Sequence, residues 1–232
     1  MRLSFIALLG ACLLSPAMAQ NMGGGLNFLA AHAIDPTHLL PPPPANDSFQ
    51  TNAELASLQQ INDTSSPQQK AAALADSKNE TVFLFAPVMG TDFTAAKFPA
   101  TAALFKQVSD DADFFEHAAK KIWRRPRPYL MDKNLIPACG APKKPSFSYP
   151  SGHAIQAWSQ GMVLAALLPS KAAAIESRAA AFAFEREICG AHYPSDLEAG
   201  HAMALVLAEQ ILASPKFQRE AAAARRELAL VK

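Results

Sequence analysis

Three short segments of the chain gather side chains that could bind an oxyanion and act on it. The first begins at Lys120 and holds five cations, the last of them Arg127, which lies between two prolines. Proline fixes its own φ and restricts the residue before it, so we expect a helix to end at Arg125. Arg127 would then lie on a stiff extended segment, where a guanidinium loses little entropy on binding phosphate. A solvated, charged helix face is the competing interpretation of this segment alone.

The second segment is Pro150-Ser151-Gly152-His153, directly before an apolar stretch. Ser151 is a good N-cap, and the unpaired N–H groups of a first helical turn attract anions. Gly152 has no side chain to keep a ligand away from the backbone. These features predict an anion site at a helix start with His153 beside it, although an ordinary capped helix with an incidental histidine gives the same pattern.

The third segment follows Arg186 and contains the sequence Gly190-Ala191-His192, with Asp196 four residues after the histidine. Gly190 is expected to end one helix, which leaves His192 in a loop before the next. A carboxylate at this spacing can bond one ring nitrogen of His192, fix the tautomer and make the other nitrogen a better nucleophile. The alternative is a helix-capping aspartate and a surface histidine.

The elements that must position these groups have a helical pattern. Segments rich in Ala, Leu and Glu predict helices at residues 53–61, 67–75, 95–123, 151–168, 171–189, 195–213 and 217–230. Ser66 before Pro67 marks one helix start, and Ser195 with Glu198 is predicted to form a capping box at another. The 95–123 helix is expected to break near Pro99.

Residues 82–88 are apolar enough for a β-strand, but no second β-branched run could pair with them. We therefore expect this segment to be buried coil or helix. The predicted fold class is all-α, a single-domain helical bundle over residues 51–232. Residues 20–50, with three glycines and a run of four prolines, are predicted to be irregular.

Residues 1–19 have the features of a secretory signal peptide. An apolar run at 3–14 precedes Ala-Met-Ala at 17–19, so cleavage is expected before Gln20. The run is too short to span a bilayer. A lipoprotein cleavage box ending at Cys12 is the competing interpretation, but the apolar run continues past that cysteine. We expect a periplasmic or secreted protein.

Composition gives few indications of partners. The net charge of the 232 residues is +1, which does not suggest binding to nucleic acid or to an anionic membrane surface. No later stretch is long and apolar enough for stable membrane insertion, and a homo-oligomer is left open. Cys139 and Cys189 remain after signal removal. They could form a disulfide in an oxidising compartment or stay two buried thiols.

Taken together, the three segments resemble the signature of the type 2 phosphatidic acid phosphatase and vanadium haloperoxidase superfamily. The matching positions, in chain order, are Lys120 with Arg127-Pro128 seven residues later, Pro150-Ser151-Gly152-His153, and Arg186 with His192 and Asp196. Over roughly residues 38–206 the chain looks most like the bacterial class A non-specific acid phosphatases, which share the Leu-Leu-Pro-Pro-Pro-Pro run at 39–44. One departure is Glu185, where the family usually has serine before the arginine.

The resemblance implies a cofactor-free and metal-free phosphatase acting on small phosphomonoesters. The expected phosphate-binding residues are Lys120, Arg127, Ser151, Gly152 and Arg186, and the expected catalytic residues are His192, His153 and Asp196. In this chemistry His192 attacks phosphorus, Asp196 orients His192, and His153 protonates the leaving group before it activates water. A lipid phosphate phosphatase, a vanadate-dependent haloperoxidase and a non-catalytic phosphate binder are the alternatives.

Overall fold

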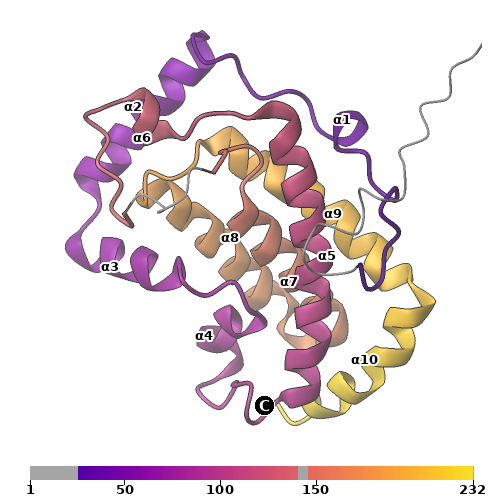
Figure 1. Ribbon diagram of the computed structural model, residues 1–232. Coiled ribbons are helices and arrows are strands. Elements are labelled where there is room, and N and C mark those ends of the chain that lie inside the picture. The colour runs from indigo at the N-terminus through magenta and orange to yellow at the C-terminus, as the bar shows by residue number, and fades with distance from the viewer. Residues whose placement is uncertain (1–25, 141–145, 232) are drawn as a thin grey trace, which may run out of the picture.

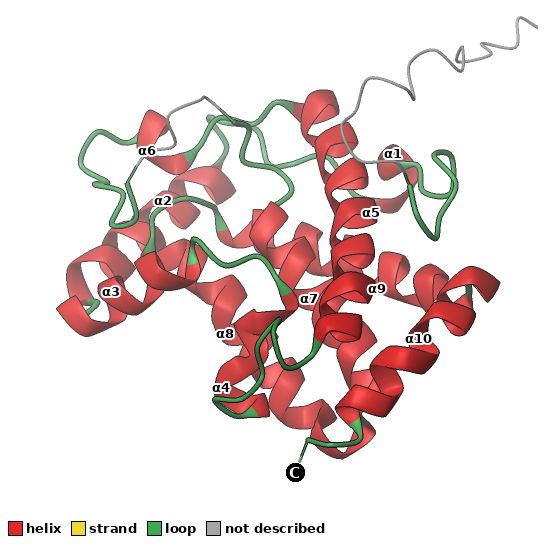
Figure 2. Cartoon of the chain, turned by 60° about the horizontal axis from the view of Figure 1, so that its bottom comes forward, coloured by secondary structure: helices red, strands yellow, loops and turns green. Residues whose placement is uncertain are grey.

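The computed structural model describes residues 26–140 and 146–231, which form helices joined by loops (Figure 1). No strand occurs in these two ranges, so the all-α prediction is confirmed (Figure 2). The predicted signal peptide at 1–19 lies outside them. The helical elements, in order, are α1 (Pro36–Leu39), α2 (Phe49–Thr64), α3 (Pro67–Asp76), η2 (Val82–Phe85), α4 (Ala86–Met89), α5 (Pro99–Trp123), α6 (Pro128–Met131), α7 (Gly152–Leu167), η3 (Pro169–Lys171), α8 (Ala172–Ile188), α9 (Pro194–Ala213) and α10 (Pro215–Leu228).

Helix α7 forms the centre of the bundle and packs against α5, α8 and α9 (Figure 1). It is apolar on nearly all sides, as expected for a helix that is surrounded by others. Its Val163 and Leu164 belong to the main core together with Phe105 of α5 and Phe182 of α8. This arrangement buries the first turn of α7, where Ser151 is the N-cap, in the interior of the protein.

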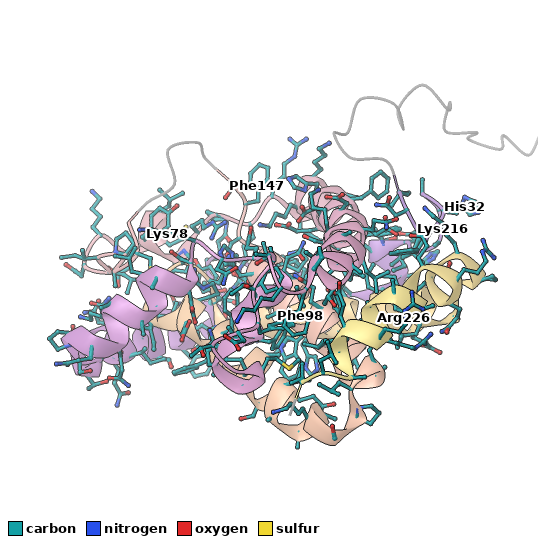
Figure 3. All side chains as sticks on the ribbon, turned by 90° about the horizontal axis from the view of Figure 1, so that it is seen from below. His32, Lys78, Phe98, Phe147, Lys216 and Arg226 are labelled. Carbon is teal, nitrogen blue, oxygen red and sulfur yellow. A yellow bond between two sulfur atoms is a disulfide. The ribbon has the colours of Figure 1, made fainter. Side chains whose placement is uncertain are left out.

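Helix α10 covers α5 and α9 on one side of the bundle. It is amphipathic: Phe217 is fully buried, whereas Arg226 is exposed. Figure 3 labels Arg226 on this helix and Phe98, a core residue that lies directly before α5. Burial of one apolar face holds the long α5 in place, and with it the basic segment that follows.

Several predicted helix starts agree with the structure. Helix α3 begins at Pro67, and the Ser66 side chain accepts a hydrogen bond from the N–H of Gln69, which closes a capping box. Residues 82–89 form the 3-10 turn η2 and α4, which confirms a helical rather than extended segment. Helix α7 begins directly after Ser151, as predicted.

Other boundaries differ from the prediction. Helix α2 begins at Phe49, four residues before the predicted start, because Ser48 caps it. Helix α5 begins at Pro99 rather than at residue 95, because proline fits the first position of a helix and not its interior.

The predicted capping box of Ser195 and Glu198 is wrong. Helix α9 starts at Pro194, and Tyr193 is its N-cap. The N–H of Tyr193 donates to the carboxylate of Asp196 over 2.9 Å. Asp196 therefore both closes the first turn of α9 and belongs to the predicted catalytic set.

The N-terminal segment is mostly loop but is fixed to the bundle. Buried Asp111 of α5 accepts hydrogen bonds from the N–H groups of Phe28 (2.7 Å) and Leu29 (3.1 Å). Farther along, the hydroxyl of Tyr149 donates to the carbonyl of Pro41 over 2.7 Å. The proline run thus packs next to the residue that precedes Pro150.

A disulfide joins Cys139 to Cys189. Cys189 is the C-cap of α8, and Gly190 follows it in the left-handed conformation with φ of 64°. The bridge ties the end of α8 to the loop after α6, and the loop that contains His192 starts at this anchored point.

Candidate active site

The three predicted segments meet in space. The N–H of Ser148 donates to the carbonyl of Arg125 over 2.8 Å, which joins the first segment to the residues before the second. The N–H of Ser151 donates to the carbonyl of Asp196 over 3.0 Å, which joins the second segment to the third. The end of α5, the start of α7 and the loop between α8 and α9 therefore form one site.

Close helix packing holds this junction together. A Cβ atom on Gly200 of α9 would lie 2.9 Å from the carbonyl oxygen of Ser151 and from the Cβ of Ala154. Only a glycine lets the two helices approach to this distance without a shift. The position of Gly200 thus fixes Asp196, one turn earlier on α9, against the start of α7.

His192 is 1% exposed, and both of its ring nitrogens have partners. Nδ1 lies 3.3 Å from Oδ2 of Asp196, and Nε2 lies 2.8 Å from Nη1 of Arg127. Because a guanidinium can only donate, Nε2 is the acceptor and Nδ1 carries the proton toward Asp196. Burial lowers the pKa of His192 well below its ordinary value, and the charges of Arg127 and Lys120 lower it further. The ring is therefore neutral, with its Nε2 lone pair directed at a cation.

Asp196 is fully buried and has two further side-chain partners that sequence reasoning missed. Its Oδ1 accepts from Nη1 of Arg125 over 2.7 Å, and Ser148 donates its hydroxyl proton to Oδ2. Arg125 also pairs with Glu54 of α2 over 2.9 Å and stacks on the Tyr193 ring at 3.7 Å. Burial raises the pKa of Asp196, and Arg125 opposes that rise. The sequence marked Arg125 only as the end of a helix, and no local signal marked Glu54.

Arg127 lies on an extended backbone segment, as its two neighbouring prolines predicted. Its backbone is extended, with φ of −72° and ψ of 151°. The side chain donates to the carbonyl of Ser146 over 3.2 Å and to its hydroxyl over 2.7 Å, and Nη1 also donates to the carbonyl of Ala191 over 3.0 Å. These bonds position the guanidinium next to Nε2 of His192.

Arg186 approaches the site from α8 and is 3% exposed. Its Nη2 donates to the carbonyl of Ala73 over 2.9 Å, whereas its Nε is buried without a hydrogen-bond partner among the residues the structure describes. Burial lowers the pKa of Arg186 to about 10. A buried, unpaired N–H on a cation is a donor available to a ligand.

Lys120 and Gly152 both contact Glu116, a residue that sequence reasoning did not select. Nζ of Lys120 lies 2.6 Å from Oε1 of Glu116, one turn earlier on α5. A Cβ on Gly152 would lie within 2.7 Å of all three atoms of the Glu116 carboxyl group. The absence of a side chain at Gly152 therefore makes room for a carboxylate of the protein itself.

His153 has both ring nitrogens bonded to the segment between α3 and η2. Nδ1 lies 3.0 Å from Oε1 of Glu80, and Nε2 lies 3.1 Å from the carbonyl of Ser77. Burial lowers the pKa of His153 to about 4, and burial together with Glu116 raises the pKa of Glu80 to about 7. The 3.0 Å contact joins Nδ1 of His153 and the carboxyl group of Glu80 in one hydrogen-bonded pair. His153 is therefore held by contacts at both ring nitrogens rather than standing alone in the site.

Glu185, the departure from the family pattern, pairs with Arg178 and not with either of the two proposed catalytic histidines. Its Oε1 lies 3.7 Å from Nη1 of Arg178, which in turn forms an ion pair with Asp76 at the end of α3. Burial and the neighbouring Asp76 raise the pKa of Glu185 to about 7. The glutamate at position 185 therefore places its carboxyl group on α8 next to that of Asp76 on α3.

Residues 26–140 and 146–231 contain neither a cluster of metal ligands nor a membrane-spanning helix. No group of three or more His, Cys, Asp or Glu side chains there could hold a metal ion. None of the helices there is long and apolar enough to cross a membrane.

Comparison with known proteins identifies the family. The PAP2 superfamily model matches residues 101–219. A non-specific acid phosphatase of Salmonella typhimurium is 30% identical over 225 residues, covering 87% of each chain. An acid phosphatase of Zymomonas mobilis is 33% identical over 148 residues, covering 62% of this chain and 55% of the relative. The chain belongs to the PAP2 superfamily. The resemblance to its bacterial non-specific acid phosphatases is confirmed over most of the chain.

The fold agrees with a solved structure of the same superfamily. The transmembrane PAP2-type phosphatidylglycerolphosphate phosphatase of Bacillus subtilis superimposes with a TM-score of 0.56 at 18% identity, covering 72% of this chain and 87% of that one. At this identity the match concerns the helical architecture alone. It supports the arrangement of the helices around the site.

Proposed function

We propose that this protein is an exported acid phosphatase that hydrolyses small phosphomonoesters through a phosphohistidine at His192. The observation that carries the proposal is the geometry of the buried His192 ring, with Nε2 2.8 Å from Arg127 and Nδ1 3.3 Å from Asp196. A nucleophile for phosphorus needs such a lone pair beside the cation that binds the phosphoryl oxygens. The similarity to acid phosphatases supports phosphatase activity.

Substrate binding uses the charges around His192. Lys120, Arg127 and Arg186 neutralise the phosphoryl oxygens, and the Nε of Arg186 gains the partner it lacks. The Ser151 hydroxyl and the N–H of Gly152 bind the oxygens at the start of α7, where the helix dipole favours an anion. Phosphoryl transfer needs mainly positioning and charge stabilisation, and these groups supply both.

In the first step Nε2 of His192 attacks phosphorus in line with the ester oxygen. The P–N bond forms as the P–O bond to the leaving group breaks. The leaving oxygen takes a proton from the His153–Glu80 pair. To donate it, Nε2 of His153 gives up its hydrogen bond to the Ser77 carbonyl and bonds the leaving oxygen of the substrate instead. Asp196 accepts a hydrogen bond from the Nδ1–H of His192 and stabilises the positive charge that forms on the ring.

In the second step a water molecule attacks the phosphohistidine. The His153–Glu80 pair takes a proton from the water, and the P–N bond breaks. Inorganic phosphate leaves, and His192 returns to the neutral form in which Arg127 and Asp196 hold it. The pair regains the proton that it donated in the first step, which completes the cycle.

A substrate panel on the purified protein tests the proposal. Hydrolysis of p-nitrophenyl phosphate and of small sugar and nucleoside monophosphates is expected, with activity unchanged by EDTA. Turnover only of lipid phosphates in vesicles would indicate a lipid phosphatase, and halide oxidation with added vanadate would indicate a haloperoxidase. Phosphate binding without any of these reactions would contradict an enzymatic role. Recovery of activity from the periplasm or medium of expressing cells tests export.

A further inference from the structure

The carboxyl group of Glu116 lies in the proposed phosphate site. Its Oε1 is 2.6 Å from Nζ of Lys120, and its three carboxyl atoms lie within 2.7 Å of where a Cβ of Gly152 would be. Two of the five residues proposed to bind phosphate therefore contact the same internal carboxylate. The side chain is only 13% exposed, so bulk water does little to screen it.

The surroundings of Glu116 are rich in charge of both signs. Besides its ion pair with Lys120, Glu116 interacts electrostatically with four other charged or titratable groups. They are Asp113 on its own helix, Glu80 before η2, His153 of α7 and Arg127 after α5. Arg186 of α8 also faces Glu80 and His153. Burial and Glu116 raise the pKa of both Glu80 and Asp113. A doubly charged phosphoryl group would thus enter a site that already holds an anion.

We infer that Glu116 selects the singly charged, protonated form of the phosphoryl group as the ligand of this site. The inference rests on the proposed function, because it assumes that phosphate binds between Lys120 and Gly152. A phosphoryl oxygen that carries a proton donates a charge-assisted hydrogen bond to the Glu116 carboxylate. A fully ionised oxygen at the same place has no proton to donate and is repelled by the Glu116 carboxylate. Glu116 is in this sense a specificity-determining residue for the charge state of the substrate.

The inference has a direct consequence for acid activity. The second ionisation of a phosphomonoester falls near pH ~6, so the singly charged form predominates only below that value. Above it, the fraction that can donate to Glu116 falls about tenfold for each pH unit. Binding therefore weakens toward alkaline pH through ionisation of the ligand, in addition to any change in the His153–Glu80 pair.

Inorganic phosphate and sulfate are matched probes for this inference. The two anions have the same shape, but sulfate holds no proton at pH ~5 and phosphate does. Isothermal titration of the purified full-length mature protein with each anion, at constant ionic strength, measures binding without turnover. At pH ~5 the wild type should bind phosphate at least about tenfold more tightly than sulfate, the value of one hydrogen bond to a charged group.

Glu116→Gln should reduce the phosphate preference to within about threefold, mainly by improving sulfate binding. Asp110→Asn is the matched control, because Asp110 lies on the same helix and also pairs with a lysine four residues away. It should keep the wild-type preference. Equal binding of the two anions by the wild type, which needs no variant to fold, overturns the inference. An unchanged preference in folded Glu116→Gln does the same, whereas failure to bind either anion contradicts the proposed phosphate site itself.

Discussion

Arg125 and Asp196 form a buried ion pair, with 2.7 Å between Nη1 and Oδ1 and side chains that are 1% and 0% exposed. Because Oδ2 of the same carboxylate faces Nδ1 of His192, the pair fixes the plane of the group that orients the proposed nucleophile. Arg125 in turn is held by Glu54 of α2. The orientation of His192 thus depends on a chain of contacts that reaches a helix far away in sequence.

Arg125→Ala is expected to destabilise the protein strongly. It leaves Asp196 and Glu54 buried without their cation, and breaking a buried pair lowers the free energy of unfolding by about 3–5 kcal/mol. Urea denaturation monitored by circular dichroism measures the change. Arg226→Ala, at an exposed position of α10, is the control and should change stability by less than about 0.5 kcal/mol. A similarly small effect of both substitutions would contradict the role of Arg125.

The His153–Glu80 pair predicts how activity depends on the leaving group. His153→Ala should lower kcat by about 10²–10⁴ for alkyl phosphates, which need a proton on the departing oxygen. The loss should be much smaller for p-nitrophenyl phosphate, whose leaving group departs without protonation. Equal losses for both substrates would show that His153 acts in some other way.

The same pair predicts the alkaline limb of the pH profile. Because the pKa of Glu80 is raised to about 7, the pair loses its proton, and activity should fall, above that pH. Glu80→Gln removes the carboxyl group, so the limb should move to lower pH, toward the pKa of His153, which burial lowers to about 4. Profiles of kcat from steady-state kinetics measure the shift. Superimposable limbs for the wild type and Glu80→Gln would exclude the pair as the proton donor.

Glu185 predicts a pH-dependent contribution to stability. Its pKa in the folded protein, about 7, lies above the ordinary value of 4.5 for a glutamate, so the folded state binds a proton that the unfolded state releases. The stabilisation is complete below about pH 4.5 and is lost as the pH rises through about 7. Glu185→Gln should therefore make the free energy of unfolding less dependent on pH between these values. Parallel curves from urea denaturation of the two proteins would refute this.

The disulfide between Cys139 and Cys189 predicts redox-dependent stability. The cysteines are 50 residues apart, and closing a loop of that length stabilises a protein by about 4 kcal/mol in the chain-entropy description. Reduction should lower the melting temperature, and the Cys139→Ser/Cys189→Ser double variant should melt at the reduced value whether or not reductant is present. An equal melting temperature with and without reductant in the wild type would contradict a structural role.

Local sequence was sufficient for the parts of the site that depend on local geometry. Two prolines define the extended backbone of Arg127, and the spacing of four residues brings Asp196 to His192. Helix starts at Ser66 and Ser151 followed from capping chemistry. At Pro194 the same reasoning failed, because proline at the first helical position placed the cap two residues before Ser195.

The acidic residues around the site could not be predicted in the same way. Glu54 and Glu80 have no local feature that separates them from solvated carboxylates elsewhere in the chain. Their roles follow from tertiary packing, which brings Glu54 to Arg125, Glu80 to His153 and Glu116 to Gly152. Only Glu116 had a signal, its spacing of one helical turn from Lys120.

Rapid acid-free quench of the protein with ³²P-labelled phosphomonoester, followed by peptide mapping, tests the central claim most directly. The label should appear on His192 within the first turnover, survive alkali and be lost in acid. It should be absent from His192→Ala, whose turnover should fall by about 10⁶, as for loss of other catalytic nucleophiles. A wild-type protein that turns over substrate without ever carrying label on His192 would contradict the account.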